Sequence, residues 1–219
     1  MSKYRYFVFD FDLTLADSSE GILICFKHVL EKFGYPQKDD RTIYNTIGLT
    51  LVDAFDILTD IPNNPQREEM RKAYVKKADE VMVRYTHFYD DTVAILQTLQ
   101  NAGVKVGIVS TKYRYRIVDT FKAQAGSFPV DIVIGGEDVK AAKPDPQGLE
   151  LIIGRFGADK KDVLYIGDSY IDAETARNAG VDFAGVTTGS TAKEDFAKYP
   201  NIYVGDSLLD IFLNIEHIK

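Results

Sequence analysis

The sequence predicts an α/β fold, a Rossmann-like doubly wound parallel sheet into which a small α-helical domain is inserted. Short β-rich runs alternate with helical patterns over most of the 219 residues, and this order is typical of parallel strands joined by right-handed crossovers. The alternation stops between Asp17 and about Thr86, where only helical periodicity remains. The first strand also runs directly into Asp10 and Asp12, although strands usually exclude aspartate.

Six short runs are expected to form the sheet because they are rich in β-branched and aromatic residues. They are Tyr4 to Phe9, Val104 to Val109, Ile132 to Ile134, Val163 to Ile166, Phe183 to Val186 and Ile202 to Val204. Helical patterns of suitable length lie between the later runs. One begins at Thr92 and ends at Gly103, and another carries Leu149 to Phe156 and ends at Gly157.

Residues 17–86, here called the helical insert, contain two amphipathic patterns. The first comprises Ile22, Phe26, Val29, Leu30 and Phe33, with helix-capping residues at 17–19 and a stop at Gly34; the second comprises Met70, Tyr74, Ala78, Val81 and Tyr85. We therefore expect residues 1–16 and 87–219 to form the α/β core. The helical insert is expected to fold over the strand ends as a cap.

Composition restricts the partners and the compartment. The formal net charge of −7 argues against a nucleic-acid polymer or an anionic membrane as partner, because both require a basic face. No apolar run is long enough to span a bilayer. The single cysteine, Cys25, lies in an apolar helical pattern and is expected to be a core residue. One thiol cannot form a disulfide within the chain, so we expect a cytoplasmic protein. We expect a monomer or a homodimer.

The candidate site consists of polar residues that follow predicted strands or precede the next helix. They are Asp10, Asp12, Ser110, Thr111, Lys143, Asp168 and Asp172. In an open α/β sheet, the carboxyl ends of the strands border the ligand-binding crevice. Carboxylates suit a hard divalent cation, while a hydroxyl and a lysine suit an anion such as phosphate. Each residue alone is compatible with a helix cap or a solvated charge, but their shared position favours one site.

At these residues the chain resembles the haloacid dehalogenase superfamily, in particular its phosphoglycolate phosphatase-like members with a helical cap. The matching motifs are Asp10-Phe11-Asp12-Leu13-Thr14, Ser110-Thr111-Lys112, Lys143-Pro144, and Gly167-Asp168-Ser169 with Asp172. They occur in the order typical of the family, and the resemblance spans the whole chain.

The resemblance implies a magnesium-dependent phosphatase that acts through an aspartyl-phosphate. Asp10 would be the nucleophile, and Asp12 would protonate the leaving alcohol and later activate water. Because dehalogenase members lack an acid two residues after the nucleophile, Asp12 favours phosphate ester chemistry.

The resemblance also implies how phosphate and metal are held. Ser110, the backbone amide of Thr111 and Lys143 would bind the transferred phosphoryl group. Mg²⁺ would bind the Asp10 carboxylate, the main-chain carbonyl of Asp12, and Asp168. Asp172 would interact with the metal indirectly, through water or another ligand.

The substrate is expected to be a small phosphorylated metabolite, either a phosphoglycolate-like, nucleotide or sugar phosphate monoester, or pyrophosphate. A hexose phosphate mutase, which uses the same aspartate pair, is the main alternative. A receiver-like module and a catalytically inactive binding protein are remote alternatives, because a receiver is about half this length and no motif residue is missing.

Substrate selection is expected from the loop from Tyr44 to Leu51, including Gly48, with Arg84, Tyr85 and His87 as further candidates. The segment Tyr113 to Arg116 combines aromatic and basic residues beside the site, but we interpret it as a solvated helix face.

Two positions depart from the family pattern. Leu13 stands where many relatives have glycine, so we expect no positive φ there, and Asp90-Asp91 replaces a Pro-Gly turn.

Overall fold

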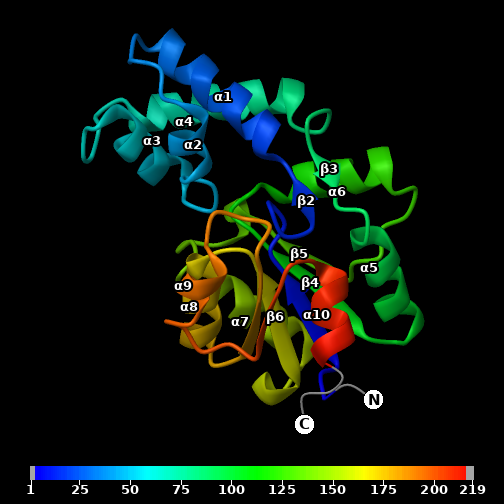
Figure 1. The fold of residues 1–219 in the computed structure, drawn as a ribbon. Coiled ribbons are helices and arrows are strands. Elements are labelled where there is room, and N and C mark those ends of the chain that lie inside the picture. The colour runs from blue at the N-terminus through cyan, green and yellow to red at the C-terminus, as the bar shows by residue number, and fades with distance from the viewer. Residues whose placement is uncertain (1–2, 216–219) are drawn as a thin grey trace.

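The computed structural model describes residues 3–215, which form a parallel α/β core with four further helices on one side (Figure 1). The main sheet has six parallel strands in the order β5-β4-β1-β6-β7-β8. Their bounds are β1 Tyr6–Phe9, β4 Lys105–Val109, β5 Ile132–Ile134, β6 Val163–Gly167, β7 Asp182–Val186 and β8 Tyr203–Gly205. The predicted Rossmann-like fold is confirmed, and each predicted strand is present with ends shifted by at most two residues.

Helices cover both faces of the sheet. One face packs against α5 (Thr92–Asn101), α6 (Arg114–Gln124) and α10 (Leu208–Ile215), and the other against α7 (Gln147–Phe156), α8 (Tyr170–Ala179) and α9 (Lys193–Phe196). Alternate residues of a strand point to opposite faces, so Phe7 and Phe9 join the first apolar cluster and Val8 joins the second. Two short 3₁₀ helices, η1 (Gly136–Asp138) and η2 (Lys160–Asp162), lie in the connections.

The helical insert contains α1 (Ser19–Lys32), α2 (Asp40–Tyr44), α3 (Leu51–Thr59) and α4 (Arg67–Val81). Its apolar cluster is separate from those of the sheet and centres on Phe26, whose ring lies 5.1 Å from Phe55 and 4.7 Å from Tyr74. The sequence pattern identified α1 and α4 but missed α2 and α3, which are five and nine residues long and too short to show a clear period. Helix α4 also ends earlier than expected, so Tyr85 lies beyond it.

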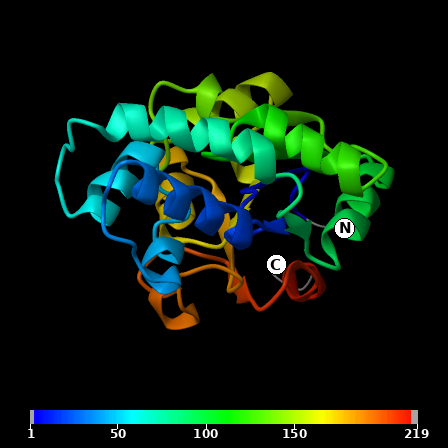
Figure 2. The same ribbon diagram turned by 90° about the horizontal axis from the view of Figure 1, so that it is seen from above.

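The chain enters and leaves the helical insert side by side. Strand β2 (Ala16–Asp17) pairs antiparallel with β3 (His87–Phe88). Viewed from above, α4 runs beside α6 of the core (Figure 2), and an Arg71 Nη1 to Tyr113 Oη hydrogen bond of 2.9 Å joins them. Among the described residues, no helix combines the length and the apolar character needed to cross a membrane.

The connection order creates a switch point beside β1. From β1 the chain continues to β4 and β5 on one side, and then crosses to β6, β7 and β8 on the other. Loops at the carboxyl ends of β1 and β6 therefore diverge, and open α/β sheets bind ligands in the crevice formed there.

The expectation that Leu13 avoids a positive φ is wrong. Its φ is 59°, in a turn where its N–H donates to the Ala16 carbonyl at 2.8 Å. The side chain is buried in the apolar cluster of the helical insert. A left-handed conformation costs roughly 1–2 kcal/mol, and burying a leucine side chain contributes about 2 kcal/mol, so packing offsets the backbone cost.

Two substitutions at Leu13 separate packing from backbone strain. Leu13→Ala should lower the free energy of unfolding by about 3 kcal/mol, because it removes a buried side chain and keeps the strained Cβ. Leu13→Gly loses the same packing but relieves the strain, so it should be more stable than the alanine variant by roughly 0.5–1 kcal/mol. Urea unfolding measures both values, and an alanine variant as stable as the glycine variant would contradict the explanation.

Candidate active site

Asp10, Lys143 and Asp172 form the centre of the site. Asp10 follows β1 directly and is buried, as are the other two. The Lys143 Nζ lies 3.0 Å from Asp10 Oδ2 and 2.6 Å from Asp172 Oδ1. The lysine is therefore fixed between two carboxylates, one from each side of the switch point.

Asp172 is held by the start of α8. Its Oδ2 accepts hydrogen bonds from the Ser169 N–H at 3.2 Å and the Ser169 Oγ at 2.6 Å, and its Oδ1 accepts one from Tyr165 Oη at 2.8 Å. A Cβ at Gly167 would lie 2.4 Å from the Asp172 side chain, so only glycine permits this approach. Both oxygens of Asp172 thus accept protein hydrogen bonds, and its Oδ1 also holds the Lys143 ammonium beside Asp10.

Asp168 follows β6 and faces two loops. Its Oδ1 accepts a hydrogen bond from Thr14 Oγ1 at 2.9 Å. Its other oxygen, Oδ2, lies so close to Gly189 that a Cβ there would be 1.8 Å away. The loop that follows β7 therefore lies directly against this carboxylate, and a side chain at position 189 would displace it.

The three carboxylates share one lysine, and burial shifts the pKa of Asp10 and of Asp168. Burial, opposed by Lys143 and reinforced by Asp172, raises the pKa of Asp10 to about 7. Burial and the charges of Asp172 and Asp10 raise the pKa of Asp168 well above its usual value. Burial alone would lower the pKa of Lys143, but Asp10 and Asp172 outweigh it and raise that pKa. The site thus contains three carboxyl groups and a single cationic side chain, and two of these carboxyl groups hold protons more tightly than usual.

The residues present fit a divalent cation. Ligand oxygens of Asp10, Asp168 and Asp172 all lie within 4.8 Å of one another. Asp10 Oδ1 is the one buried side-chain polar atom, within residues 3–215, that has no hydrogen-bond partner. An all-oxygen donor set in which carboxyl groups outnumber cationic side chains suits hard cations, so the cluster can hold one.

Asp12 belongs to a second group of polar residues. Its Oδ1 accepts hydrogen bonds from Lys112 Nζ at 2.5 Å and from Ser18 Oγ, while no bond to its Oδ2 occurs among the described residues. Sequence reasoning gave no role to Lys112, whose only signal was its place after Ser110 and Thr111. Ser18 was expected to cap α1, but its hydroxyl donates to Asp12 and makes no capping bond.

The structure brings the expected phosphate-binding residues together. Ser110, Thr111 and Lys143 line one small cavity next to the loop that follows β5. The Ser110 Oγ accepts a hydrogen bond from the Lys112 N–H at 3.2 Å.

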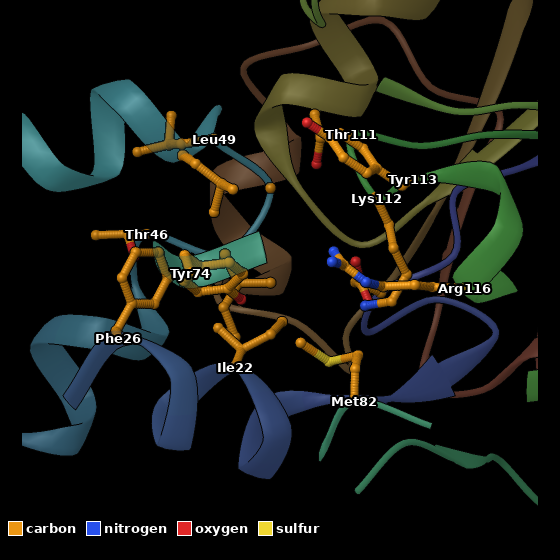
Figure 3. Close-up of a pocket in the computed structure, with 14 residues that line it drawn as sticks. Ile22, Phe26, Thr46, Leu49, Tyr74, Met82, Thr111, Lys112, Tyr113 and Arg116 are labelled. Atoms are coloured by element: carbon orange, nitrogen blue, oxygen red, sulfur yellow. The ribbon is translucent and has the colours of Figure 1, made fainter. Parts of the chain in front are cut away.

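A larger cavity of about 70 Å³ lies beside Asp12, between the core and the helical insert (Figure 3). The loop expected to select substrate contributes residues 46–49 and Leu51 to its lining. The α2 end of that loop contacts the core, because Tyr44 Oη donates to the Thr188 carbonyl at 3.1 Å.

The interpretation of Tyr113 to Arg116 as a solvated helix face is wrong for Tyr113 and Arg116. Both line this cavity, and the Arg116 side chain is buried against α4. Its Nη2 donates to Asp79 Oδ1 at 2.7 Å and to the Val75 carbonyl at 2.8 Å. The pattern could not show this burial, because α4 is distant in sequence.

The other candidates lie elsewhere. Arg84 and His87 line a separate, open cavity, and Tyr85 is partly buried and absent from the lining of both cavities. Cys25 is buried in the apolar cluster of the helical insert, as expected, and burial raises the pKa of its thiol to about 12.

Both a family model and individual known proteins match the sequence of this chain. A family model described as haloacid dehalogenase-like hydrolase matches residues 7–186. Pyrophosphatase PpaX from Bacillus velezensis is 30% identical over 216 residues, which cover 97% of this chain and 96% of that protein.

Solved structures agree with these sequence matches. A haloacid dehalogenase-like hydrolase from Bacteroides fragilis is 47% identical, with a TM-score of 0.91, over 94% of this chain and 98% of that chain. A predicted phosphoglycolate phosphatase from Haemophilus somnus is 20% identical, with a TM-score of 0.87, over 97% of this chain and 98% of that chain. The second likeness shows a shared fold.

Removing the Asp172 carboxylate should strongly destabilise the protein. Asp172→Ala leaves Lys143 with one buried carboxylate, the Ser169 hydroxyl without its acceptor, and Tyr165 with only a long hydrogen bond of 3.5 Å to the Val109 carbonyl. We therefore expect the free energy of unfolding to fall by about 3–5 kcal/mol. Glu174→Ala on the same helix is the control, because its pair with Arg177 is partly exposed and contributes about 0.5 kcal/mol or less. Urea unfolding of both variants gives the comparison, and equal effects would contradict the role assigned to Asp172.

The raised pKa of Asp10 predicts a pH-dependent stability of the metal-free protein. The folded state binds this proton more tightly than the unfolded chain, so the free energy of unfolding should fall as pH rises from about 4 towards about 7. Asp10→Asn cannot ionise. In the presence of a chelator it should be more stable than the wild type near pH 7.5, by on the order of 2 kcal/mol, and the difference should shrink near pH 5. Thermal or urea unfolding at both pH values tests this, and a difference that grows at low pH would disprove it.

Proposed function

The chain belongs to the haloacid dehalogenase-like hydrolase family, and from this premise we propose that it is a magnesium-dependent phosphatase acting through an aspartyl-phosphate. The observation that carries the proposal is Asp10, a buried carboxylate with one unpartnered oxygen, placed 3.0 Å from Lys143 at the switch point of the sheet. Phosphoryl transfer depends mainly on positioning and charge neutralisation, which this arrangement supplies.

Asp10 and Asp12 would share the covalent steps. An oxygen of Asp10 attacks phosphorus and the bond to the leaving oxygen breaks, while Asp12 gives that oxygen a proton. Water then attacks the aspartyl-phosphate, and Asp12 takes the proton of this water, so that phosphate and free Asp10 are released. Oδ2 of Asp12 suits proton exchange, because Lys112 and Ser18 occupy only Oδ1.

The remaining residues would neutralise the transferred group. Ser110, the Thr111 backbone amide and Lys143 line the same cavity and would donate to the phosphoryl oxygens. Asp10, the Asp12 carbonyl and Asp168 would hold Mg²⁺, with Asp172 positioning Lys143. When bound, the metal would supply further positive charge to the phosphoryl group.

The substrate proposed is a small phosphate monoester or pyrophosphate. Support comes from the relative named as a pyrophosphatase and from the small cavity beside Asp12. We propose that residues 17–86 act as the cap over this site and residues 1–16 and 87–219 as the catalytic core. The cytoplasmic location inferred from the single cysteine is part of the same proposal.

Phosphate release from purified protein tests this function. With magnesium and a panel of 2-phosphoglycolate, pyrophosphate, nucleoside monophosphates and sugar phosphates, we expect release that a chelator abolishes. Asp10→Asn should reduce it at least about 10³-fold, since the nucleophile is lost.

Asp159→Asn serves as the control, because Asp159 is exposed and precedes β6 at the opposite edge of the sheet. Release that persists in Asp10→Asn, or no release from any compound by folded wild type, would contradict the proposal. Turnover of a hexose phosphate that needs a bisphosphate and frees no phosphate would identify a mutase instead.

A further inference from the structure

The cavity beside Asp12 limits the size of the leaving group. Its volume is about 70 Å³, and a cavity needs about 10–15 Å³ of such volume to hold one water molecule. A group of a few non-hydrogen atoms fits this space, whereas a nucleobase or a hexose ring would have to extend beyond it. Because Asp12 lines the cavity, a leaving group that receives its proton from Asp12 would lie here.

The cavity lining carries a net positive charge. Asp12, Lys112 and Arg116 are its charged residues, and all three are buried. Lys112 is paired with Asp12 at 2.5 Å, so these two charges cancel and Arg116 supplies the excess.

Arg116 is fixed in place but keeps free donors. Its Nε and Nη2 donate to Asp79 and Val75, and its guanidinium lies 5.3 and 5.1 Å from the ring centres of Tyr113 and Tyr115. Within residues 3–215, Nη1 has no hydrogen-bond partner. Asp79 is about half exposed and is absent from the cavity lining, so solvent screens its charge more than that of the guanidinium.

The wall opposite the cations is apolar. Figure 3 shows Lys112 and Arg116 reaching in from the core, and Ile22, Phe26, Tyr74 and Met82 from the helical insert. The leaving group of pyrophosphate is itself a phosphate, which is polar on every side and carries more than one charge. Burying it against this wall would cost hydration that one cation cannot restore. A short carbon chain with one charged end matches both walls.

We propose that Arg116 is a specificity-determining residue that selects a short organic leaving group with a single negative charge. An example is a hydroxy acid of two or three carbons, which leaves from its phosphate ester and whose carboxylate carries the charge. The inference rests on the proposed phosphatase function and deepens it. The carboxylate accepts hydrogen bonds from Nη1, and the carbon chain contacts the apolar wall.

Kinetics with matched substrates test the inference. We would measure kcat/KM of the wild type and of Arg116→Met for 2-phosphoglycolate, for ethyl phosphate, which is similar in size but has no carboxylate, and for pyrophosphate. The wild type should prefer 2-phosphoglycolate to both. Arg116→Met should lower kcat/KM for 2-phosphoglycolate roughly 10- to 100-fold, mainly through KM, because a charge-assisted hydrogen bond is lost. The kcat/KM for ethyl phosphate should change less than about 3-fold, since ethyl phosphate has no carboxylate to accept this hydrogen bond.

Two further variants separate recognition from folding. Asp79→Asn weakens the link to α4 but keeps the guanidinium, so the preference for 2-phosphoglycolate should persist. Arg116→Lys keeps the charge and should restore part of the preference. The inference is overturned if Arg116→Met lowers kcat/KM equally for all three substrates. It is also overturned if Asp79→Asn abolishes the preference for 2-phosphoglycolate, or if the wild type prefers pyrophosphate. In each case Asp10-dependent release would still support the phosphatase. Absence of release from every substrate would instead refute the function itself.

Discussion

The structure depends on one electrostatic constraint, which is that three buried carboxylates share a single lysine. Asp10, Asp168 and Asp172 come from two neighbouring strand ends, and Lys143 is within ion-pair distance of two of them. Such a cluster is costly in the absence of a cation. The fold tolerates it because Tyr165, Ser169 and Thr14 donate hydrogen bonds to the carboxylates, and because glycines at 167 and 189 let backbone approach them. In the proposed function, the stability that this cluster removes from the metal-free protein is the cost of a site that binds a cation and a phosphoryl group.

The helical insert completes the site in two places. Ser18, at its entrance, donates to Asp12, and Asp79 on α4 fixes Arg116 of the core. Asp12 and Arg116 line the same cavity. Any movement of α4 relative to α6 would therefore change the position of the guanidinium that we assign to substrate selection. The apolar wall of the cavity belongs almost wholly to the helical insert, while the cations belong to the core. In the inference drawn above, recognition of a leaving group that is part apolar and part charged thus requires both the core and the helical insert.

Much of this arrangement follows from local sequence patterns. The features that the patterns missed share one cause. The strands, the two long helices of the insert and the polar strand ends follow from period and position, because each depends on residues near in sequence. Lys112 and Arg116 escaped prediction because their partners lie far along the chain. The pairs Lys112–Asp12 and Arg116–Asp79 are separated by 100 and 37 residues. Leu13 shows the opposite error, since a local rule about φ gave way to burial of its side chain in the insert.

The sequence by itself determined the α/β class, the position of the helical insert, the family and the set of polar residues at the strand ends. These features are carried by short-range periodicity and by residues at fixed spacing, which need no knowledge of packing. The tertiary structure decided which oxygen of Asp10 is unpartnered, that Asp172 positions Lys143, and that Arg116 lies in a cavity against an apolar wall. These properties depend on burial and on distances between remote segments. Only the packed chain sets both, because charge, hydration and cavity size are properties of the assembled interior.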